Sequence, residues 1–240
     1  MKAVLLAAGY GERLRPLTES RPKCMVAVGG RPILERHVHR LRDAGITELA
    51  INLHHRPEAV TGHFGDGAEF GVAIRWSHED DLLGTAGALV PLTRWLGDQA
   101  FLVLYADNII ECDLGALLRL HRERRAAATI ALFERDDVGA SGVAEVTADG
   151  TVERFVEKPR PGETESNLVS AGLLACSPLV LDFVPAEPPS DIGRDVLPAL
   201  LVAGETVVGY RLSPPESLLW IDTPADLARA ERAIAAAAAR

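Results

Sequence analysis

A short apolar segment near the start of the chain leads directly into a loop that carries glycine and basic residues. Residues Lys2–Leu6 are mostly apolar, and Gly9 interrupts the run. Such a run predicts a buried first strand. The loop that follows contains Gly9, Gly11 and Arg13, and in layered α/β folds ligands bind beyond the carboxyl ends of the strands. We therefore expect this first loop (residues 7–25) to form part of a binding site.

Apolar runs and helical patterns alternate along the rest of the chain. Strands are expected at residues 2–6, 49–53, 72–76, 101–105 and 129–133, and a hairpin at residues 143–147 and 151–156 around Asp149-Gly150. Helices are expected from Pro32 to Gly45, from Gly84 to Leu96 with an interruption at Pro91, from Asp113 to Arg125, and after Thr223-Pro224. This alternation predicts a layered α/β fold whose sheet is mostly parallel with an antiparallel hairpin insertion.

Composition narrows the class of protein. The 240 residues correspond to one large domain, or two small ones at most. No stretch approaches the roughly 20 consecutive apolar residues of a membrane span. The three cysteines, Cys24, Cys112 and Cys176, are far apart and form no metal-binding pair. This usage fits a reducing cytoplasm, where disulfides are rare.

Charge is distributed unevenly along the chain. The net charge is −9, yet the first 45 residues hold nine basic and four acidic side chains. An acidic remainder argues against nucleic-acid binding, which needs a broad basic face. A small basic region next to a glycine-bearing loop suits a compact anion such as a nucleotide. The alternative is that these charges only solvate the surface.

The first loop combines glycines with basic residues that suit a triphosphate. Gly9 and Gly11 allow the backbone to approach a phosphate chain, and Arg13 and Lys23 supply positive charge. A Rossmann dinucleotide loop would have a third glycine where Leu14 stands, and the Gly-Lys-Ser/Thr of a P-loop is missing. The whole pattern GxGxRLxPLTxxxPKxM is far more specific than its glycines.

This pattern resembles the signature of the sugar-1-phosphate nucleotidylyltransferases, the NDP-sugar pyrophosphorylases. Further segments resemble that family in order along nearly the whole chain: residues 29–35, 64–72, 83–89, 105–108, 155–159, 170–172 and 220–224. The resemblance implies a Rossmann-like three-layer nucleotide-diphospho-sugar transferase fold. It implies one domain over residues 1–240, in which residues 1–110 mainly bind the NTP and residues 111–240 mainly bind the sugar phosphate.

The resemblance also implies which residues form the site. Catalytic roles are implied for Arg13, Lys23, Asp107 and Lys158. NTP binding is implied for Leu6, Ala8, Gly9, Gly11, Glu12, Arg13, Lys23, Gly84, Thr85 and Gly87. Sugar-phosphate binding is implied for Asn108, Gly142, Glu157, Lys158 and Ala171. Asp107 and Asp222 are the implied ligands of Mg²⁺, which takes oxygen ligands and usually only one or two carboxylates.

The implied reaction is an in-line attack of a sugar-1-phosphate oxygen on the α-phosphate of an NTP, with pyrophosphate leaving. Both reactants are anions, so catalysis is mainly positioning and charge neutralisation. Residues 64–72, 83–89 and 155–159 favour the mannose-1-phosphate guanylyltransferase-like branch, and hence GTP. Asp107-Asn108 is nearer to the glucose-1-phosphate thymidylyltransferase type, which leaves dTTP or UTP as alternatives. The short last segment is similar to phosphocholine-type cytidylyltransferases, which leaves CTP.

Several positions depart from the family pattern. Glu12 replaces a small hydroxyl residue and either weakens triphosphate binding or pairs with Arg13 or Arg15. The glycine expected near Asp222-Thr223 is missing. We expect no C-terminal β-helix domain, because the sequence ends soon after this segment. These departures keep open a catalytically silent paralogue that binds a nucleotide-sugar.

The expected partners are small molecules, an NTP and a sugar-1-phosphate, with no nucleic acid and no membrane. Homo-oligomerisation stays open. A nicotinamide dehydrogenase would need an acidic residue after the second strand to hold the ribose, but His54-His55-Arg56 stands there.

Overall fold

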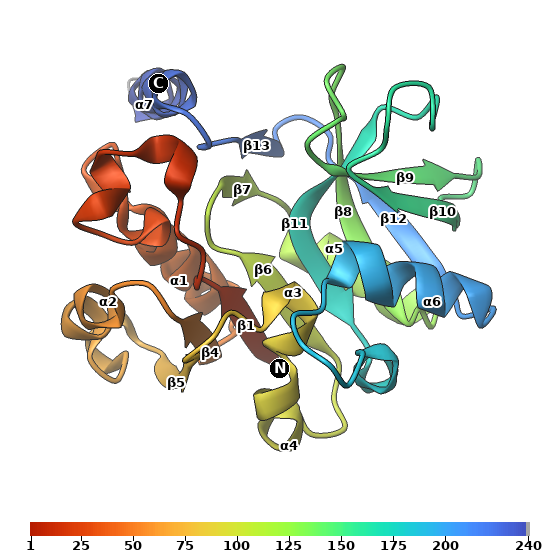
Figure 1. Cartoon of the computed structure of the whole chain (residues 1–240), viewed down its shortest axis with the longest axis horizontal. Helices are drawn as coiled ribbons and strands as arrows, with labels where there is room; N and C mark the ends of the chain where they lie inside the picture. Colours follow the sequence, from red (N-terminus) through yellow and green to blue (C-terminus); the bar gives the residue numbers. More distant parts are fainter. Residues whose placement is uncertain (239–240) are drawn as a thin grey trace. The chain divides into compact units, whose positions relative to one another are not determined.

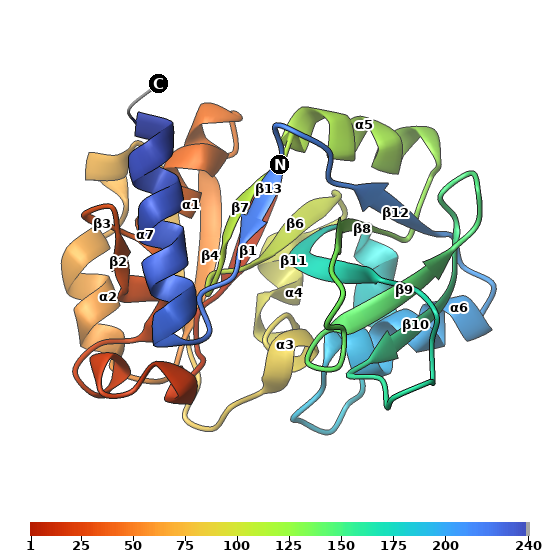
Figure 2. The same ribbon diagram turned by 90° about the horizontal axis from the view of Figure 1, so that it is seen from above.

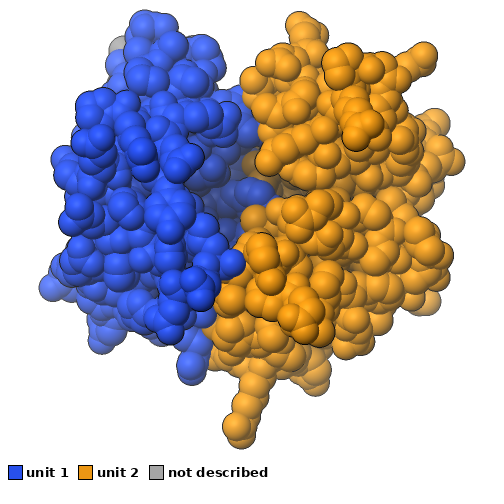
Figure 3. Space-filling model, viewed as in Figure 1, with its two compact units in different colours: residues 1–82, 104–110, 218–240 blue, residues 83–103, 111–217 orange. Residues whose placement is uncertain are grey.

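The computed structural model describes residues 1–238 (Figure 1). These residues divide into two compact units (Figure 3). Unit 1 consists of residues 1–82, 104–110 and 218–238, and unit 2 of residues 83–103 and 111–217. Three separate stretches of chain therefore build unit 1. The two units are defined by contacts between residues of the chain and say nothing of which substrate each unit binds. The expected NTP-binding half (residues 1–110) and sugar-phosphate-binding half (residues 111–240) therefore stay predictions.

A parallel sheet forms the centre of unit 1. Its strands follow the order β6-β1-β4-β5, and β1–β4 and β4–β5 pair in parallel. The bounds are β1 Lys2–Leu6, β4 Glu48–Leu53, β5 Ala73–His78 and β6 Phe101–Tyr105, the last continuing from unit 2. The expected strands at 2–6 and 101–105 are confirmed residue for residue. The ends of β1, β4 and β5 lie at one edge because the strands run in parallel.

Helices and a small hairpin complete unit 1. The helices are α1 Ile33–Asp43, α2 Pro57–Phe64 and α7 Pro224–Ala238, and the hairpin joins β2 Ala27–Val28 to β3 Arg31–Pro32. Helix α1 buries Leu34, Val38 and Leu41 on one face, as expected. Pro32 precedes the helix and does not occupy its first turn. Helix α7 lies beside β2 (Figure 2), and Thr223 and Asp226 cap its start by mutual hydrogen bonds.

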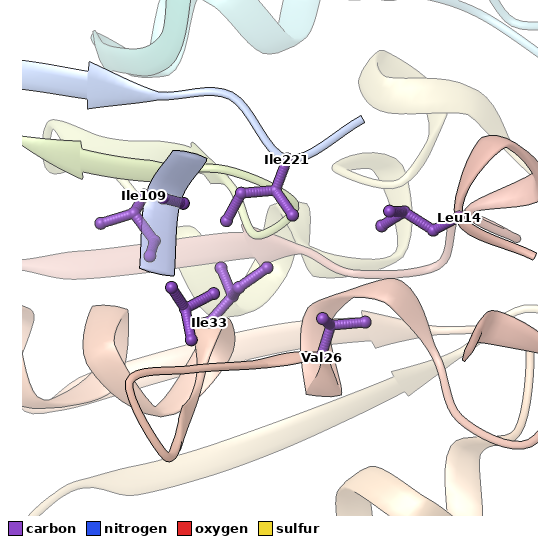
Figure 4. Close-up of a cluster of buried hydrophobic side chains, with 7 residues drawn as sticks. Leu14, Val26, Ile33, Ile109 and Ile221 are labelled. Atoms are coloured by element: carbon purple, nitrogen blue, oxygen red, sulfur yellow. The ribbon is translucent and has the colours of Figure 1, made fainter. Parts of the chain in front are cut away.

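A cluster of buried apolar side chains packs the first loop against other segments of unit 1 (Figure 4). Its members are Leu14, Val26, Val28, Ile33, Ile109, Ile221 and Ala230. They come from the first loop, the hairpin, α1, β7 (Ile109–Glu111), the segment before α7, and α7. Burying one such Leu or Ile contributes about 1.5–3 kcal/mol. The cluster therefore holds three chain segments in fixed relation close to Lys23, Asp107 and Asp222.

Unit 2 begins with an interrupted helical segment. The expected helix 84–96 is divided into α3 Gly84–Gly87, a 3₁₀ turn at Val90–Leu92 and α4 Thr93–Leu96. The interruption falls at Pro91, which has no N–H to donate. Helix α5 spans Leu114–Glu123, and the Asp113 side chain accepts a hydrogen bond from the N–H of Ala116 at its start. Helix α6 spans Leu197–Val202.

The strands of unit 2 are mostly antiparallel. The expected hairpin is confirmed as β9 Gly142–Val146 and β10 Val152–Glu157. Strand β11, Leu168–Cys176, pairs antiparallel with β9 and with β8 Ala128–Glu134, and β12 Val207–Arg211 pairs parallel with β8. Strand β13, Ser217–Leu219, lies mostly in unit 1 and pairs there with β7. The mixed α/β class is confirmed, although the antiparallel part is larger than one hairpin.

Within residues 1–238, the helices are all too short or too polar to cross a membrane. Cys24, Cys112 and Cys176 are all buried.

Candidate functional site

Two carboxylates of unit 1 converge on one ammonium group. Lys23 Nζ lies 2.8 Å from Asp107 Oδ2 and 2.6 Å from Asp222 Oδ1. Arg13 contributes a second cation, with its guanidinium 3.2 Å from Asp222 Oδ2. These four residues come from the first loop, the turn after β6 and the segment before α7. The structure therefore brings together three of the four expected catalytic residues and both expected metal ligands.

The ammonium at the centre of this group is buried. The Lys23 side chain is 9% exposed, whereas Asp107 is 40% exposed. Burial lowers the pKa of Lys23, but Asp107 and Asp222 outweigh that effect, so the pKa is raised above its ordinary value. Lys23 is consequently a fixed positive charge at neutral pH. It forms ion pairs with both carboxylates, of which Asp107 is the more exposed to solvent.

Asn108 fixes the orientation of the carboxylate pair. Its amide donates to Asp107 Oδ1 at 3.1 Å, and its carbonyl oxygen accepts from the N–H of Ile221 at 3.0 Å. Ile221 directly precedes Asp222. Both ends of the Asn108 amide thus join the segments that carry Asp107 and Asp222. Its expected role in sugar-phosphate binding stays a prediction.

A buried histidine supports the same turn. His37 Nε2 lies 2.6 Å from the backbone oxygen of Asn108. Burial lowers the pKa of His37 to about 4, against a weaker opposing effect of the Asn108 hydrogen bond. The ring is therefore neutral at pH 7. Because a carbonyl oxygen can only accept, Nε2 carries the proton and donates it.

The two glycines of the first loop, Gly9 and Gly11, lie in different surroundings. Gly11 has φ +65°, and a Cβ there would lie 2.7 Å from Lys23 Cβ. Its lack of a side chain lets the loop close over Lys23. A Cβ on Gly9 would meet nothing within 4 Å. Only Gly9 thus leaves open space beside the backbone, as close approach of a phosphate would require.

The other expected NTP-binding residues of the first loop lie around this turn. Leu6 ends β1, and Ala8 is buried two residues later. Glu12 and Arg15 are exposed and form a long ion pair of 3.8 Å, which is one of the two outcomes expected for Glu12. Exposed pairs of this kind contribute little to stability.

Sequence reasoning missed a buried polar pair at the same sheet edge. The carbonyl oxygen of Asn52 accepts from the N–H of Ala7 at 2.7 Å, and its amide donates to Glu79 Oε1 at 2.8 Å. Glu79 directly follows β5 and is 7% exposed. A carboxylate is therefore connected through one side chain to the first loop. The only signal for it in the sequence is an acidic residue three positions after the expected strand 72–76.

In unit 2 the segment that contains the expected NTP-binding residues Gly84, Thr85 and Gly87 is hydrogen-bonded to the residues before α6. Thr85 Oγ1 donates to Asp191 Oδ2 at 2.8 Å and accepts from the N–H of Ile192 at 2.9 Å. Gly84 has φ +80°, and a Cβ there would overlap the backbone oxygen of Ser190. A Cβ on Gly87 would lie 3.3 Å from Ser190 Oγ. The glycines of this segment thus permit close packing within the chain. Binding of the NTP by the segment stays a prediction.

The expected sugar-phosphate residues of unit 2 gather at the end of β10. Glu157 ends the strand and pairs in register with Gly142, while Ala171 is buried on β11. Lys158 follows in a left-handed conformation with φ +52°, and its Nζ is 3.9 Å from Glu157 Oε1. Its side chain is 67% exposed, so the ammonium is accessible to an anion.

The donor set at Asp107 and Asp222 fits a Mg²⁺ ion. The Asp107 and Asp222 carboxylates both contact Lys23 Nζ, so they are close enough together to bind one divalent cation in place of that ammonium. Among the described residues, no group of three or more His, Cys, Asp or Glu side chains could hold a metal. The carboxylates of Asp107 and Asp222 suit Mg²⁺, which combines one or two carboxylates with water and substrate phosphates.

The fold and this site define a class of protein. The chain belongs to the nucleotidyl transferase family, whose model matches residues 2–235.

Particular relatives make the class more specific. The chain is 34% identical over 217 residues to a UTP–glucose-1-phosphate uridylyltransferase of Synechocystis sp., covering 85% of this chain and 56% of that protein. It is 33% identical over 230 residues to a mannose-1-phosphate guanylyltransferase of Mycobacterium tuberculosis, covering 95% of this chain and 62% of that protein. The crystal structure of a putative glucose-1-phosphate thymidylyltransferase from Bacillus anthracis, in complex with a sucrose, is similar with a TM-score of 0.86 and 26% identity. That likeness covers 97% of this chain and 94% of the other. The chain thus spans less than two thirds of the length of these two curated relatives.

Proposed function

We propose that this protein transfers a nucleotidyl group from an NTP to a sugar-1-phosphate and releases pyrophosphate. The observation that carries the proposal is the convergence of Asp107 and Asp222 on Lys23, with Arg13 beside them. The group offers two carboxylates for a divalent cation and two cations for phosphates. The relatives named above are nucleotidyltransferases that act on sugar-1-phosphates, which supports the same reaction.

The residues divide the work between the two substrates. Arg13 and Lys23 bind the phosphates of the NTP, and Lys158 binds the phosphate of the sugar. A phosphate oxygen of the sugar-1-phosphate forms a bond to the α-phosphorus, and the bond from that phosphorus to the pyrophosphate oxygen breaks. Asp107 and Asp222 would hold Mg²⁺, which supplies positive charge against the triphosphate when bound. Little covalent chemistry is required of the protein.

We favour GTP and a mannose-1-phosphate-like acceptor. The Glu79 carboxylate is hydrogen-bonded to Asn52, which is itself bonded to Ala7 of the first loop. Its position beside this loop supports the binding of a purine base that carries two neighbouring hydrogen-bond donors. A carboxylate only accepts hydrogen bonds, and guanine presents N1–H and an exocyclic amino group side by side. Uracil and thymine present a single N–H between two carbonyl groups. UTP or dTTP with glucose-1-phosphate, and CTP with phosphocholine, are the alternatives that the test below includes.

The test is pyrophosphate release over a grid of substrates with Mg²⁺. Five nucleotides (ATP, GTP, CTP, UTP and dTTP) are each combined with mannose-1-phosphate, glucose-1-phosphate and phosphocholine. We expect one pair to give turnover that EDTA abolishes, and GTP with mannose-1-phosphate is the expected pair. Silence over the whole grid with measurable NTP binding would favour the silent paralogue.

A matched pair of variants links any activity to the site. Asp107→Asn keeps the shape of the side chain but removes one charge, so turnover is expected to fall at least about 100-fold. Asp98→Asn is the control, because Asp98 is exposed on the loop before β6. Undiminished turnover in Asp107→Asn would contradict the assignment.

We further propose that the protein acts in the cytoplasm, which its three buried and widely separated cysteines support.

A further inference from the structure

Two glycines from separate elements enclose one oxygen of the Glu157 carboxylate. A Cβ atom on Gly142, the first residue of β9, would lie 2.6 Å from Glu157 Oε2. A Cβ on Gly193, in the helical turn Ile192–Val196, would lie at the same 2.6 Å from that oxygen. Neither glycine has a positive φ. Space, and not backbone conformation, therefore requires glycine at both positions.

Strand β10 explains why the two glycines face one side chain. Phe155 and Glu157 are two residues apart on a strand, so both project from the same face. A Cβ on Gly142 would lie 2.5 Å from Phe155 Cζ, and a Cβ on Gly193 would lie 3.0 Å from Phe155 Cε1. The buried phenyl ring and the two glycines thus form a socket for Oε2. We call Gly142, Phe155 and Gly193 the glycine socket.

The other carboxylate oxygen remains directed to the cation. Glu157 Oε1 lies 3.9 Å from Lys158 Nζ. Burial raises the pKa of Glu157 and Asp191 raises it further, while Lys158 and Arg194 oppose both effects. Asp191 is engaged elsewhere, since it accepts hydrogen bonds from Thr85 and from the N–H groups of Gly193 and Arg194. The socket therefore holds Oε2 while Oε1 points to the ammonium.

We propose that Gly193 is a positioning residue for the sugar-phosphate site, acting with Gly142 to hold the Glu157 carboxylate next to Lys158. The proposal rests on the proposed function, in which Glu157 and Lys158 bind the sugar-1-phosphate. Any side chain at residue 193 moves the carboxylate out of the socket, because the backbone carrying Gly193 is held by Asp191 and cannot retreat freely. Sugar recognition is then lost, while Arg13 and Lys23 in unit 1, which bind the NTP phosphates in the proposed function, keep their contacts.

The experiment measures KM for each substrate in the full chain, using the active pair from the substrate grid. Gly193→Ala is expected to raise KM for the sugar-1-phosphate about 10- to 100-fold, the range that a shift of about 1 Å produces. KM for the NTP is expected to stay within about twofold. Gly139→Ala is the control, since a Cβ there would meet only Asp137 at 3.9 Å.

A double variant separates positioning through Glu157 from a general structural role. In the Glu157→Ala background, Gly193→Ala is expected to add no further rise in KM for the sugar-1-phosphate. Multiplying effects would overturn the proposal, because Gly193 would then act independently of Glu157. If Glu157→Ala raises that KM but Gly193→Ala does not, the socket is wrong and the proposed function stands. If Glu157→Ala leaves it unchanged, the sugar-phosphate assignment is wrong and the socket proposal falls with it.

Thermal unfolding gives a readout that needs no activity. Removing the Glu157 carboxylate makes room for the new Cβ, so the double variant is expected to melt about 3 °C or more above Gly193→Ala alone. If Gly193→Ala does not fold, recovery of folding in the double variant supports the proposal. A double variant that melts no higher than Gly193→Ala, or that stays unfolded, overturns it.

Discussion

Replacing Lys23 by Met removes the ammonium that neutralises Asp107 and Asp222 while it keeps an unbranched, largely apolar side chain. Asp107 then loses its ion pair with Lys23, and Asp222 keeps Arg13, at 3.2 Å, as its counter-ion. Leaving a buried charge unpaired typically costs about 3–5 kcal/mol. Asp107 is 40% exposed, and water there screens part of the repulsion. We therefore expect a loss of about 2–3 kcal/mol in the free energy of unfolding.

A divalent cation is expected to reverse this loss. With Lys23 in place, the position between the carboxylates is already neutralised, and Mn²⁺ without nucleotide should stabilise the protein little. In Lys23→Met the pair is open to Mn²⁺, and an ion at 100 times its dissociation constant adds about 2.7 kcal/mol. The sign of the difference between the two proteins follows from electrostatics alone.

Urea unfolding with and without Mn²⁺ measures both effects on the same samples. Lys158→Met is the control, because its side chain is 67% exposed and its replacement should change neither value appreciably. The reasoning is refuted if Lys23→Met is as stable as the parent chain. It is also refuted if Mn²⁺ stabilises the two proteins equally.

Three further substitutions test other parts of the structure. Lys158→Ala should raise KM for the sugar-1-phosphate at least about tenfold and leave KM for the NTP nearly unchanged, and steady-state kinetics showing equal effects would place the lysine elsewhere. His37 has a folded pKa of about 4 against 6.5 when unfolded, so the unfolded chain binds more protons and stability falls as pH drops from 6.5 to 4, by about 3 kcal/mol. His37→Gln keeps a donor to Asn108 without titrating, and its urea midpoints should fall less over that window than those of the parent chain; parallel curves would contradict the pKa. Glu79→Gln should lower kcat/KM for GTP relative to UTP by about tenfold, since one acceptor oxygen becomes a donor, and an unchanged ratio would remove Glu79 from base recognition.

Local patterns were sufficient for much of the fold. The apolar runs 2–6 and 101–105 form β1 and β6, and Asp149-Gly150 lies in the turn of the expected hairpin. The expected helix 84–96 is interrupted by a 3₁₀ turn that contains Pro91. Each of these depends on neighbouring residues, whose preferences the sequence displays directly. Strand β11 was missed because Leu168–Cys176 is almost uniformly apolar and lacks the alternation of a half-buried strand. Periodicity alone does not distinguish such a run from a buried helical segment.

The site was predictable in its residues but not in its contacts. Family resemblance named Lys23, Asp107 and Asp222, and the structure adds that they meet at one nitrogen atom. The supports were not visible in the sequence. Gly193 and Asn52 act on partners 36 and 27 residues away, and single positions carry no signal for pairings over such separations.

The division of unit 1 into three stretches has a consequence for synthesis of the chain. All of unit 2 has been made once residue 217 leaves the ribosome, whereas unit 1 still lacks Asp222 and α7. Domains generally fold as units from the N-terminus onward, but here the first stretch must wait for the last. Lys23 and Asp107 are therefore joined by their third partner only after all of unit 2 has been synthesised, so a polypeptide terminated within unit 2 would lack the assembled centre.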